Sequence, residues 1–370
     1  MEWALGYYNN INANNGDRER LRYYYKTLAG IRITSQAQLE PYRYCKIIKE
    51  NIIIDFPNPD LSVFDDLKEV FGSIEINNCP VYGFNSLKLV FGSISFINCP
   101  TITGFDSLVY VDGDLNVMDS PLLTSIPIFT YLNIINGSIY VVNTGITQLS
   151  SFDAVYKLSN ITISTNPQMV SFESLMSITT IKNILIIDNP VLNTLPYFVS
   201  LTKMEGLVVQ NTALTSIVGF SSVVDLADIV IENNALLTSV IPFGNVFQIA
   251  NIVIGYNGAL AVLPVFNTLF IAANIIISHN DALTSLSQYP SLSAVGNFII
   301  DNNPLLTTIN QLGNVNAIGN IVIDNNPGLT SVTLKNFHIG NLVVINNALL
   351  TQLDVTRSII QGYTLQPNLV

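Results

Sequence analysis

Aliphatic and polar residues alternate along the chain in a short recurring phrase, Gly-x-Ile-x-Ile-x-x-Asn-Pro, whose clearest copies are residues 296–304 and 319–327. Successive side chains of a β-strand point to opposite faces. The first aliphatic position, here called the anchor, and the residue two positions later therefore face the interior of a short strand. The anchors are Ile53, Ile74, Ile94, Leu115, Ile139, Ile161, Ile184, Leu207, Ile229, Ile252, Ile275, Phe298, Ile321 and Leu342.

Successive anchors are 20 to 24 residues apart, most often 23. A period of this size is typical of a solenoid, in which each unit buries its apolar face only against its neighbours. The pattern predicts a mainly β fold, a right-handed parallel β-solenoid of about 14 coils, because the phrase recurs 14 times.

A small or amide side chain follows each anchor by five residues, first Cys79, Cys99, Ser120 and Thr144, and then mostly asparagine from Asn166 to Asn347. We expect these side chains to stack inside the solenoid and to bond backbone groups that are freed where the strand turns a corner.

The charge distribution divides the chain into a mildly basic leader and an acidic body. Residues 1–50 contain eight Lys and Arg against five Asp and Glu, whereas the remainder contains seven against 21. We expect a Tyr-rich cap or arm in residues 1–44, the solenoid in 45–355, and a C-terminal cap or tail in 356–370. A short helix is predicted within the leader, capped by Asn14 or Asn15 and ended by Gly30.

Several function classes are disfavoured by the composition. An acidic body lacks the concentrated Lys and Arg that bind phosphate, so nucleic acid is not an expected partner. The sequence has no apolar run of membrane-spanning length, no signal peptide and no lipid-anchor signal, so we expect no membrane span. Three cysteines are too few for a disulfide scaffold, and the apolar core is expected to supply the stability.

The spacing of the anchor, the residue two later and the amide five later resembles that of leucine-rich repeats. The longer phrases Cys45-Lys-Ile-Ile-Lys-Glu-Asn-Ile-Ile-Ile-Asp55 and Asp60-Leu-Ser-Val-Phe-Asp-Asp-Leu-Lys-Glu-Val-Phe-Gly-Ser-Ile-Glu-Ile76 resemble the first two coils of the receptor L domains of insulin and epidermal-growth-factor receptors, and their fungal cell-wall relatives. The resemblance covers about residues 45–355. It implies ligand binding and an extracellular or cell-surface location. In that family the counterpart of Cys45 is usually paired with an earlier cysteine, which this chain lacks.

The residue after each anchor is expected to point outward from the main sheet. It is polar or aromatic in the early coils and aliphatic from the seventh coil onward. Eight stacked aliphatic residues would form a stripe on the order of 30 Å long, and soluble monomers seldom expose so much contiguous apolar surface. We predict a partner-binding or self-association surface here. The alternatives are that these residues only express β-propensity or that a terminal segment of the chain covers them. The stripe consists of Leu185, Val208, Val230, Val253, Ile276, Ile299, Val322 and Val343.

The leader contains a second candidate contact, the run Tyr23, Tyr24 and Tyr25. The interpretation we favour is a cap over the first coil, which repeat proteins need. The other is a docking arm, since tyrosine and arginine are enriched at interfaces.

The remaining polar candidates give little sign of catalysis. Cys79 and Cys99 fall at equivalent positions of adjacent coils, where a disulfide is geometrically possible, but we expect free buried thiols. The stacked pair Asp301 and Asp324 has a spacing that glycosidases use, although a solvated turn edge is the favoured interpretation. His279 and His338 fall at different repeat positions, so no metal site is expected, and no cofactor is predicted.

These observations predict a non-catalytic protein-binding or adhesion module that uses the outer face of a parallel sheet. The alternative is a structural subunit of a large assembly such as a cell wall, coat or virus particle, in which the stripe is a permanent contact. A polysaccharide-acting enzyme is a distant third possibility. The ligand, the compartment and the oligomeric state do not follow from the sequence.

Overall fold

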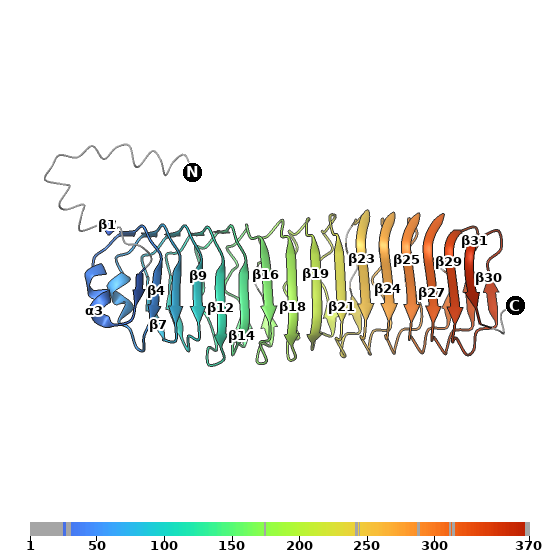
Figure 1. Ribbon diagram of the computed structural model, residues 1–370, viewed down its shortest axis with the longest axis horizontal. Helices are drawn as coiled ribbons and strands as arrows, with labels where there is room; N and C mark the ends of the chain where they lie inside the picture. The colour runs from blue at the N-terminus through green and yellow to red at the C-terminus, as the bar shows by residue number, and fades with distance from the viewer. Residues whose placement is uncertain are drawn as a thin grey trace, which may run out of the picture.

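The computed structural model describes residues 25–26, 31–173, 175–240, 243, 245–286, 289–310, 312 and 315–366. These residues form an elongated parallel β-solenoid of about 14 turns with one short α-helix near its N-terminal end (Figure 1). The predicted mainly β, parallel solenoid is therefore confirmed. Each turn contributes one strand to a continuous sheet that runs the length of the molecule.

This main sheet has 16 strands in the part of the chain that is described, all paired in parallel and in chain order. It begins before and ends after the range 45–355 that the repeated phrase covers. Its strands are β2 (Ile31–Ile33), β4 (Ile52–Asp55), β6 (Ile74–Asn77), β9 (Ile94–Ile97), β12 (Leu115–Ser120), β14 (Ile139–Thr144), β16 (Asn160–Ser164), β18 (Asn183–Asn189), β19 (Gly206–Thr212), β21 (Asp228–Glu232), β23 (Gln248–Gly255), β24 (Ile271–Ser278), β25 (Ala294–Asp301), β27 (Ala317–Asp324), β29 (His338–Ile345) and β31 (Ile359–Leu365).

Shorter parallel sheets line the other sides of the coils. A six-stranded sheet contains β1 (Tyr25–Lys26), β3 (Ile47–Ile48), β5 (Glu69–Val70), β8 (Leu89–Val90), β11 (Tyr110–Val111) and β13 (Ile134–Ile135). The others pair β7 (Val81–Gly83) with β10 (Ile102–Gly104), β15 (Gln148–Leu149) with β17 (Ser171–Phe172), β20 (Ser216–Ile217) with β22 (Ser239–Val240), and β28 (Ser331–Thr333) with both β26 (Thr308–Ile309) and β30 (Gln352–Asp354).

The pairing register corrects one predicted anchor. Ile52, and not Ile53, pairs with the anchor Ile74, so that Ile52 and Ile54 are buried and Ile53 points outward beside Glu75. Three consecutive isoleucines satisfy an alternating pattern in either register, and a shift of one residue exchanges the two faces of a strand. Only the neighbouring strand decides between the two registers.

The amide side chains that follow the anchors by five residues form a ladder inside the solenoid, as predicted. Asn303 shows the repeated geometry: its Nδ2 donates to the carbonyl oxygens of Ile277 (3.0 Å) and Asp301 (2.9 Å), and its Oδ1 accepts from the backbone N–H of Asn280 (3.1 Å). The ladder ends on Gln366, whose Oε1 accepts from the backbone N–H of Asn347 (2.9 Å). The fully buried asparagines are Asn166, Asn189, Asn234, Asn257, Asn280, Asn303, Asn326 and Asn347.

Aromatic rings stack along a second line in the interior. Phe198, Phe220, Phe243, Phe266 and Tyr289 lie on successive coils with centroid separations of 5.1 to 6.2 Å. Stacked rings of similar size on successive coils give the interior a regular, favourable aromatic packing along the rod.

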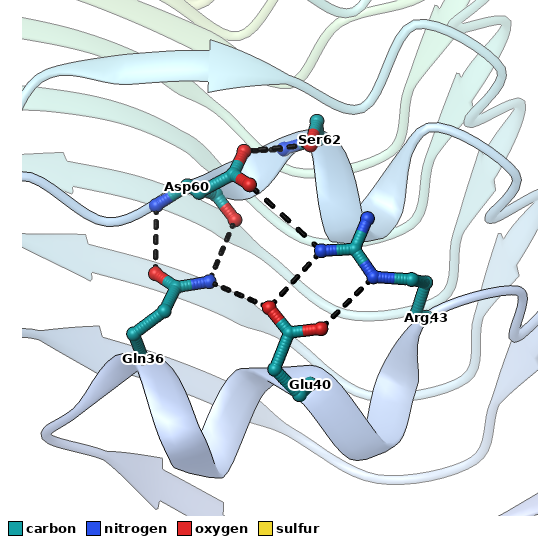
Figure 2. Close-up of polar contacts among 5 residues, drawn as sticks. All are labelled: Gln36, Glu40, Arg43, Asp60 and Ser62. Carbon is teal, nitrogen blue, oxygen red and sulfur yellow. Dashed lines mark hydrogen bonds and ion pairs between the residues drawn. The ribbon is translucent and has the colours of Figure 1, made fainter.

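A helical cap covers the N-terminal coil, built from α3 (Gln36–Leu39) and the 3-10 helix η1 (Glu40–Tyr42). Figure 2 shows how Glu40 accepts from Arg43 Nε (2.9 Å) while Gln36 Oε1 accepts from the backbone N–H of Asp60 (2.9 Å), which directly precedes the 3-10 helix η2 (Leu61–Phe64). The hydrogen bonds from Arg43 and then Gln36 lower the pKa of Glu40. This network ties the cap to the following coil.

The helix predicted between Asn14 or Asn15 and Gly30 lies mostly outside the described residues, and where it can be checked it is wrong. Tyr25–Lys26 form strand β1, which pairs with β3. A run of tyrosines has high strand propensity, and the edge of a sheet offers it backbone partners.

Candidate functional site

The structure brings all eight residues of the predicted stripe into one line on the outer face of the main sheet. Parallel pairing places each residue beside the next, from Leu185 against Val208 to Val322 against Val343. Thr162 continues the line at one end and Thr364 at the other. At a rung spacing of about 4.8 Å, the seven intervals of the stripe span about 34 Å.

All eight stripe residues are partly exposed to solvent. The residues directly before and after each stripe residue in the sequence are buried. In β25, for example, Phe298 and Ile300 face the core and Ile299 faces outward. The stripe is therefore a surface feature. Tyr23 and Tyr24 lie outside the described residues, and Tyr25 lies in β1 of the six-stranded sheet.

Asparagines directly before the anchors form a second ladder along one side of the stripe. Asn297 Nδ2 donates to Asn274 Oδ1 (2.6 Å), and Asn320 Nδ2 donates to Asn297 Oδ1 (2.7 Å). The same contact joins Asn274 to Asn251 and Asn251 to Asp228, both at 2.6 Å. Because each amide is held by its neighbours, this side of the stripe has little side-chain freedom to lose on binding.

Carboxylates and other polar groups line part of the opposite side of the stripe. Asp301 and Asp324 are paired across adjacent strands, as predicted. Each accepts from an asparagine amide, Asp301 from Asn302 (2.7 Å) and Asp324 from Asn346 (2.8 Å). These contacts are those of a hydrogen-bonded turn edge beside the stripe.

The two histidines occupy different local environments. His279 occupies a corner where the backbone has a positive φ of 54°, and its ring stacks on Tyr256 with centroids 4.2 Å apart. His338 Nδ1 lies 3.3 Å from the carbonyl oxygen of Asn316. Within the described ranges, no three His, Cys, Asp or Glu side chains gather in a way that could hold a metal ion.

Cys45, Cys79 and Cys99 are buried, and none of them forms a disulfide within the described residues, as the favoured interpretation predicted for Cys79 and Cys99. Burial raises the pKa of Cys79 from 9.0 to about 12 and that of Cys99 to about 11. The thiolate is the reactive form, and burial disfavours it.

We expect no reaction of Cys79 or Cys99 with a thiol-specific dye at pH 8 in the folded protein. With a pKa of about 12, only about one thiol in 10⁴ is ionised at this pH. Absorbance of the released dye should report three thiols after unfolding in guanidinium and almost none before it. Rapid labelling of the folded chain would contradict the burial seen here.

A groove on a different side of the solenoid was missed in the sequence. It has a volume of about 400 Å³ and lies over the segments that precede β16, β18, β19 and β21. Three of the seven Lys and Arg of residues 51–370 line it, namely Lys157, Lys182 and Lys203. Lys157 and Lys203 lie four residues before their anchors, and Lys182 lies two residues before its anchor. Because the lysines do not share one position of the repeat, the repeat pattern did not reveal them.

In each coil the backbone turns a corner just before it enters the main sheet. The groove exists because the structure of this corner changes along the solenoid. The six-stranded sheet fills this corner up to β13, and from β23 onward the main strands themselves extend back into it. Between them the described backbone makes only isolated bridges, such as Thr180 to Lys203 and Lys203 to Asp225. The groove, defined here as the lysine groove, is the hollow left between the two arrangements.

No helix among the described residues has the length and apolar character needed to cross a membrane. Neither a scan against protein-family models nor a search of the curated proteins gives a match to this chain.

Proposed function

We propose that this chain is a non-catalytic protein-binding or adhesion module that recognises its partner through the outer face of the main sheet. The observation that carries the proposal is the stripe from Leu185 to Val343, eight aliphatic side chains in register and partly exposed. Contiguous apolar surfaces of this size on soluble proteins usually mark contact sites. The resemblance of residues 45–355 to receptor L domains supports recognition at a cell surface.

The surroundings of the stripe suit a preorganised contact. The asparagine ladder on one side is already fixed by hydrogen bonds along the rod, and the interior ladder holds the strands beneath it. A rigid surface loses little entropy when a partner binds, so a larger part of the apolar burial contributes to affinity.

A structural subunit of a larger assembly is the second candidate, and one feature of the same face favours it. Asparagine amides border one side of the stripe, and the acceptors Asp301 and Asp324 border part of the other. A second copy of the chain has the same rung spacing, so its amides can be matched with these carboxylates along the stripe.

The double variant Ile276→Lys/Ile299→Lys is expected to abolish contacts made by the stripe, because two buried ammonium groups at an apolar interface lose their hydration. Its matched control is Thr284→Lys/Thr307→Lys, which adds the same charges to exposed positions of the same two coils. Light scattering over a concentration series measures self-association, and quantitative pull-down from native material measures binding of other proteins.

A wild-type oligomer that the stripe variant converts to a monomer would support the structural subunit. A monomer that binds another protein and loses at least tenfold in affinity in the stripe variant only would support the recognition module. If the stripe variant retains both the mass and the binding of the wild type, the stripe is not a contact surface and the proposal fails.

A further inference from the structure

We propose that the lysine groove is a binding site for an acidic saccharide, a sugar that carries a carboxylate. The site is separate from the stripe and does not depend on the function proposed above. Three properties of the groove support it: lysines at one end that make no ion pair with the described residues, hydrogen-bonding groups along the walls, and an apolar floor.

The groove gathers positive charge although the molecule as a whole is negatively charged. The formal net charge is −11, yet Lys157, Lys182 and Lys203 line a single groove. Lys203 is paired with Asp225 (2.6 Å), whereas Lys157 and Lys182 make no ion pair with any described residue. Lys157 is close enough to Asp112 to help lower the pKa of that carboxylate, but it makes no direct ion pair with it. Two ammonium groups without a direct ion pair at one hollow attract an anionic group, and their field acts over several ångströms.

Asn136 lines the groove one coil before Lys157, and its side-chain oxygen has no hydrogen-bond partner in the described part of the chain. Its Nδ2 donates to Asp112 Oδ1 (2.7 Å) and to the hydroxyl of Tyr110 (2.9 Å). Hydrogen bonds from Tyr110 and then Asn136 lower the pKa of Asp112, so this carboxylate is ionised and can only accept. The amide nitrogen of Asn136 must therefore face Asp112. Its Oδ1 is left buried and without a hydrogen-bond partner among the described residues, and a ligand hydroxyl that displaces the atoms covering it would satisfy this oxygen.

The remaining polar groups suit a polyhydroxylated ligand. Ser159 and Thr180 carry hydroxyls that can donate or accept, and the carboxylate of Glu205 accepts hydrogen bonds from sugar hydroxyls. The carboxylates of Glu205 and Asp225 lie on later coils than Lys157 and Lys182. We place the anionic group of the ligand between these two lysines and its hydroxyls toward the carboxylates.

The floor of the groove consists of Leu158, Ile181 and Met204, of which 3 to 5% is exposed. Such a floor can pack against the C–H face of a sugar ring, whereas it offers inorganic phosphate no favourable contact. Ligand sites generally have volumes of about 300 to 1,000 Å³, and the 400 Å³ of this groove accommodates a ring with its substituents.

The test is isothermal titration of the full chain with trisaccharides of glucuronic and of galacturonic acid, beside the neutral glucose and galactose trisaccharides. We expect an acidic trisaccharide to bind and the neutral ones to bind at least tenfold more weakly. The variant Lys157→Gln/Lys182→Gln should lose at least tenfold in affinity. The matched control Lys68→Gln/Lys88→Gln removes the same charge from two other coils and should bind as the wild type does.

Several results would overturn the proposal. Binding of neither acidic trisaccharide would do so, as would equal affinity for the neutral sugars or unchanged affinity in Lys157→Gln/Lys182→Gln. Inorganic phosphate that competes with the trisaccharide at equal concentration would show a simple anion site instead. The variant Asn136→Ala separates the acceptor from the cations, because it removes the amide oxygen without changing the charge and should weaken binding with both lysines in place. Circular dichroism of each variant checks that the fold is unchanged.

Discussion

Replacing Asn303 with leucine is expected to lower the free energy of unfolding by about 4 kcal/mol. This is the largest effect that we predict for a single substitution. Leucine has the same branching and the same number of non-hydrogen atoms as asparagine but cannot bond the backbone N–H of Asn280 or the carbonyl oxygens of Ile277 and Asp301. Each buried group left without a partner costs about 1 to 3 kcal/mol. Guanidinium unfolding followed by circular dichroism measures the change.

The matched control is Asn297→Leu, in the same coil. Asn297 makes similar amide contacts, with Asn274 and Asn320, but on the partly exposed outer face, where water can replace them. We expect a loss below about 1 kcal/mol. Equal losses in the two variants would mean that the inner ladder contributes through packing and not through the backbone groups it bonds.

Gly319→Ala is expected to destabilise the fold by about 3 kcal/mol, because the added methyl group has no space. Its carbon would lie 2.4 Å from the carbonyl oxygen of Gly296 on the preceding coil. That oxygen belongs to the backbone of β25, so relief requires the two strands to move apart. A methyl group added at Gly340 would meet the carbonyl oxygen of Gly319 in the same way, at 2.3 Å.

Gly258→Ala provides the control for this second prediction. The nearest atom to a methyl group there is Asp281 Oδ2 at 3.8 Å, an ordinary contact. Thermal unfolding should show a change within about 0.5 kcal/mol for Gly258→Ala and a clear drop in the midpoint for Gly319→Ala. A tolerated Gly319→Ala would show that adjacent coils separate more easily than the hydrogen-bonded register implies.

The sequence was sufficient for the architecture where one residue type recurs at one position of the repeat. The buried asparagines from Asn166 to Asn347 and the outward aliphatics from Leu185 to Val343 were placed correctly on their faces. Both follow from two short-range regularities, the alternation of side chains along a strand and the constant length of a coil. Stacking of identical coils then leaves little freedom in the register.

The sequence did not predict the structure correctly where neighbouring residues fit two arrangements equally well. The run Ile52, Ile53 and Ile54 fits either strand register, and only pairing with Ile74 and Ile76 selects one. Tyr25 and Lys26 were predicted as helix, and an available sheet edge turns them into a strand. In both cases a partner elsewhere in the chain outweighs the local preference.

By itself, the sequence determined the repeat, the interior amide ladder and the position of the stripe, because each depends on spacing within one coil and its recurrence in the next. The tertiary structure decided the first strand register, the placement of β1 and the existence of the lysine groove. The groove brings Asn136, Lys157, Lys182 and Lys203 together from four coils, at a corner whose backbone differs before and after it. The groove forms because neighbouring coils differ at this corner. A repeat motif records only what the coils have in common, so it cannot predict such a groove.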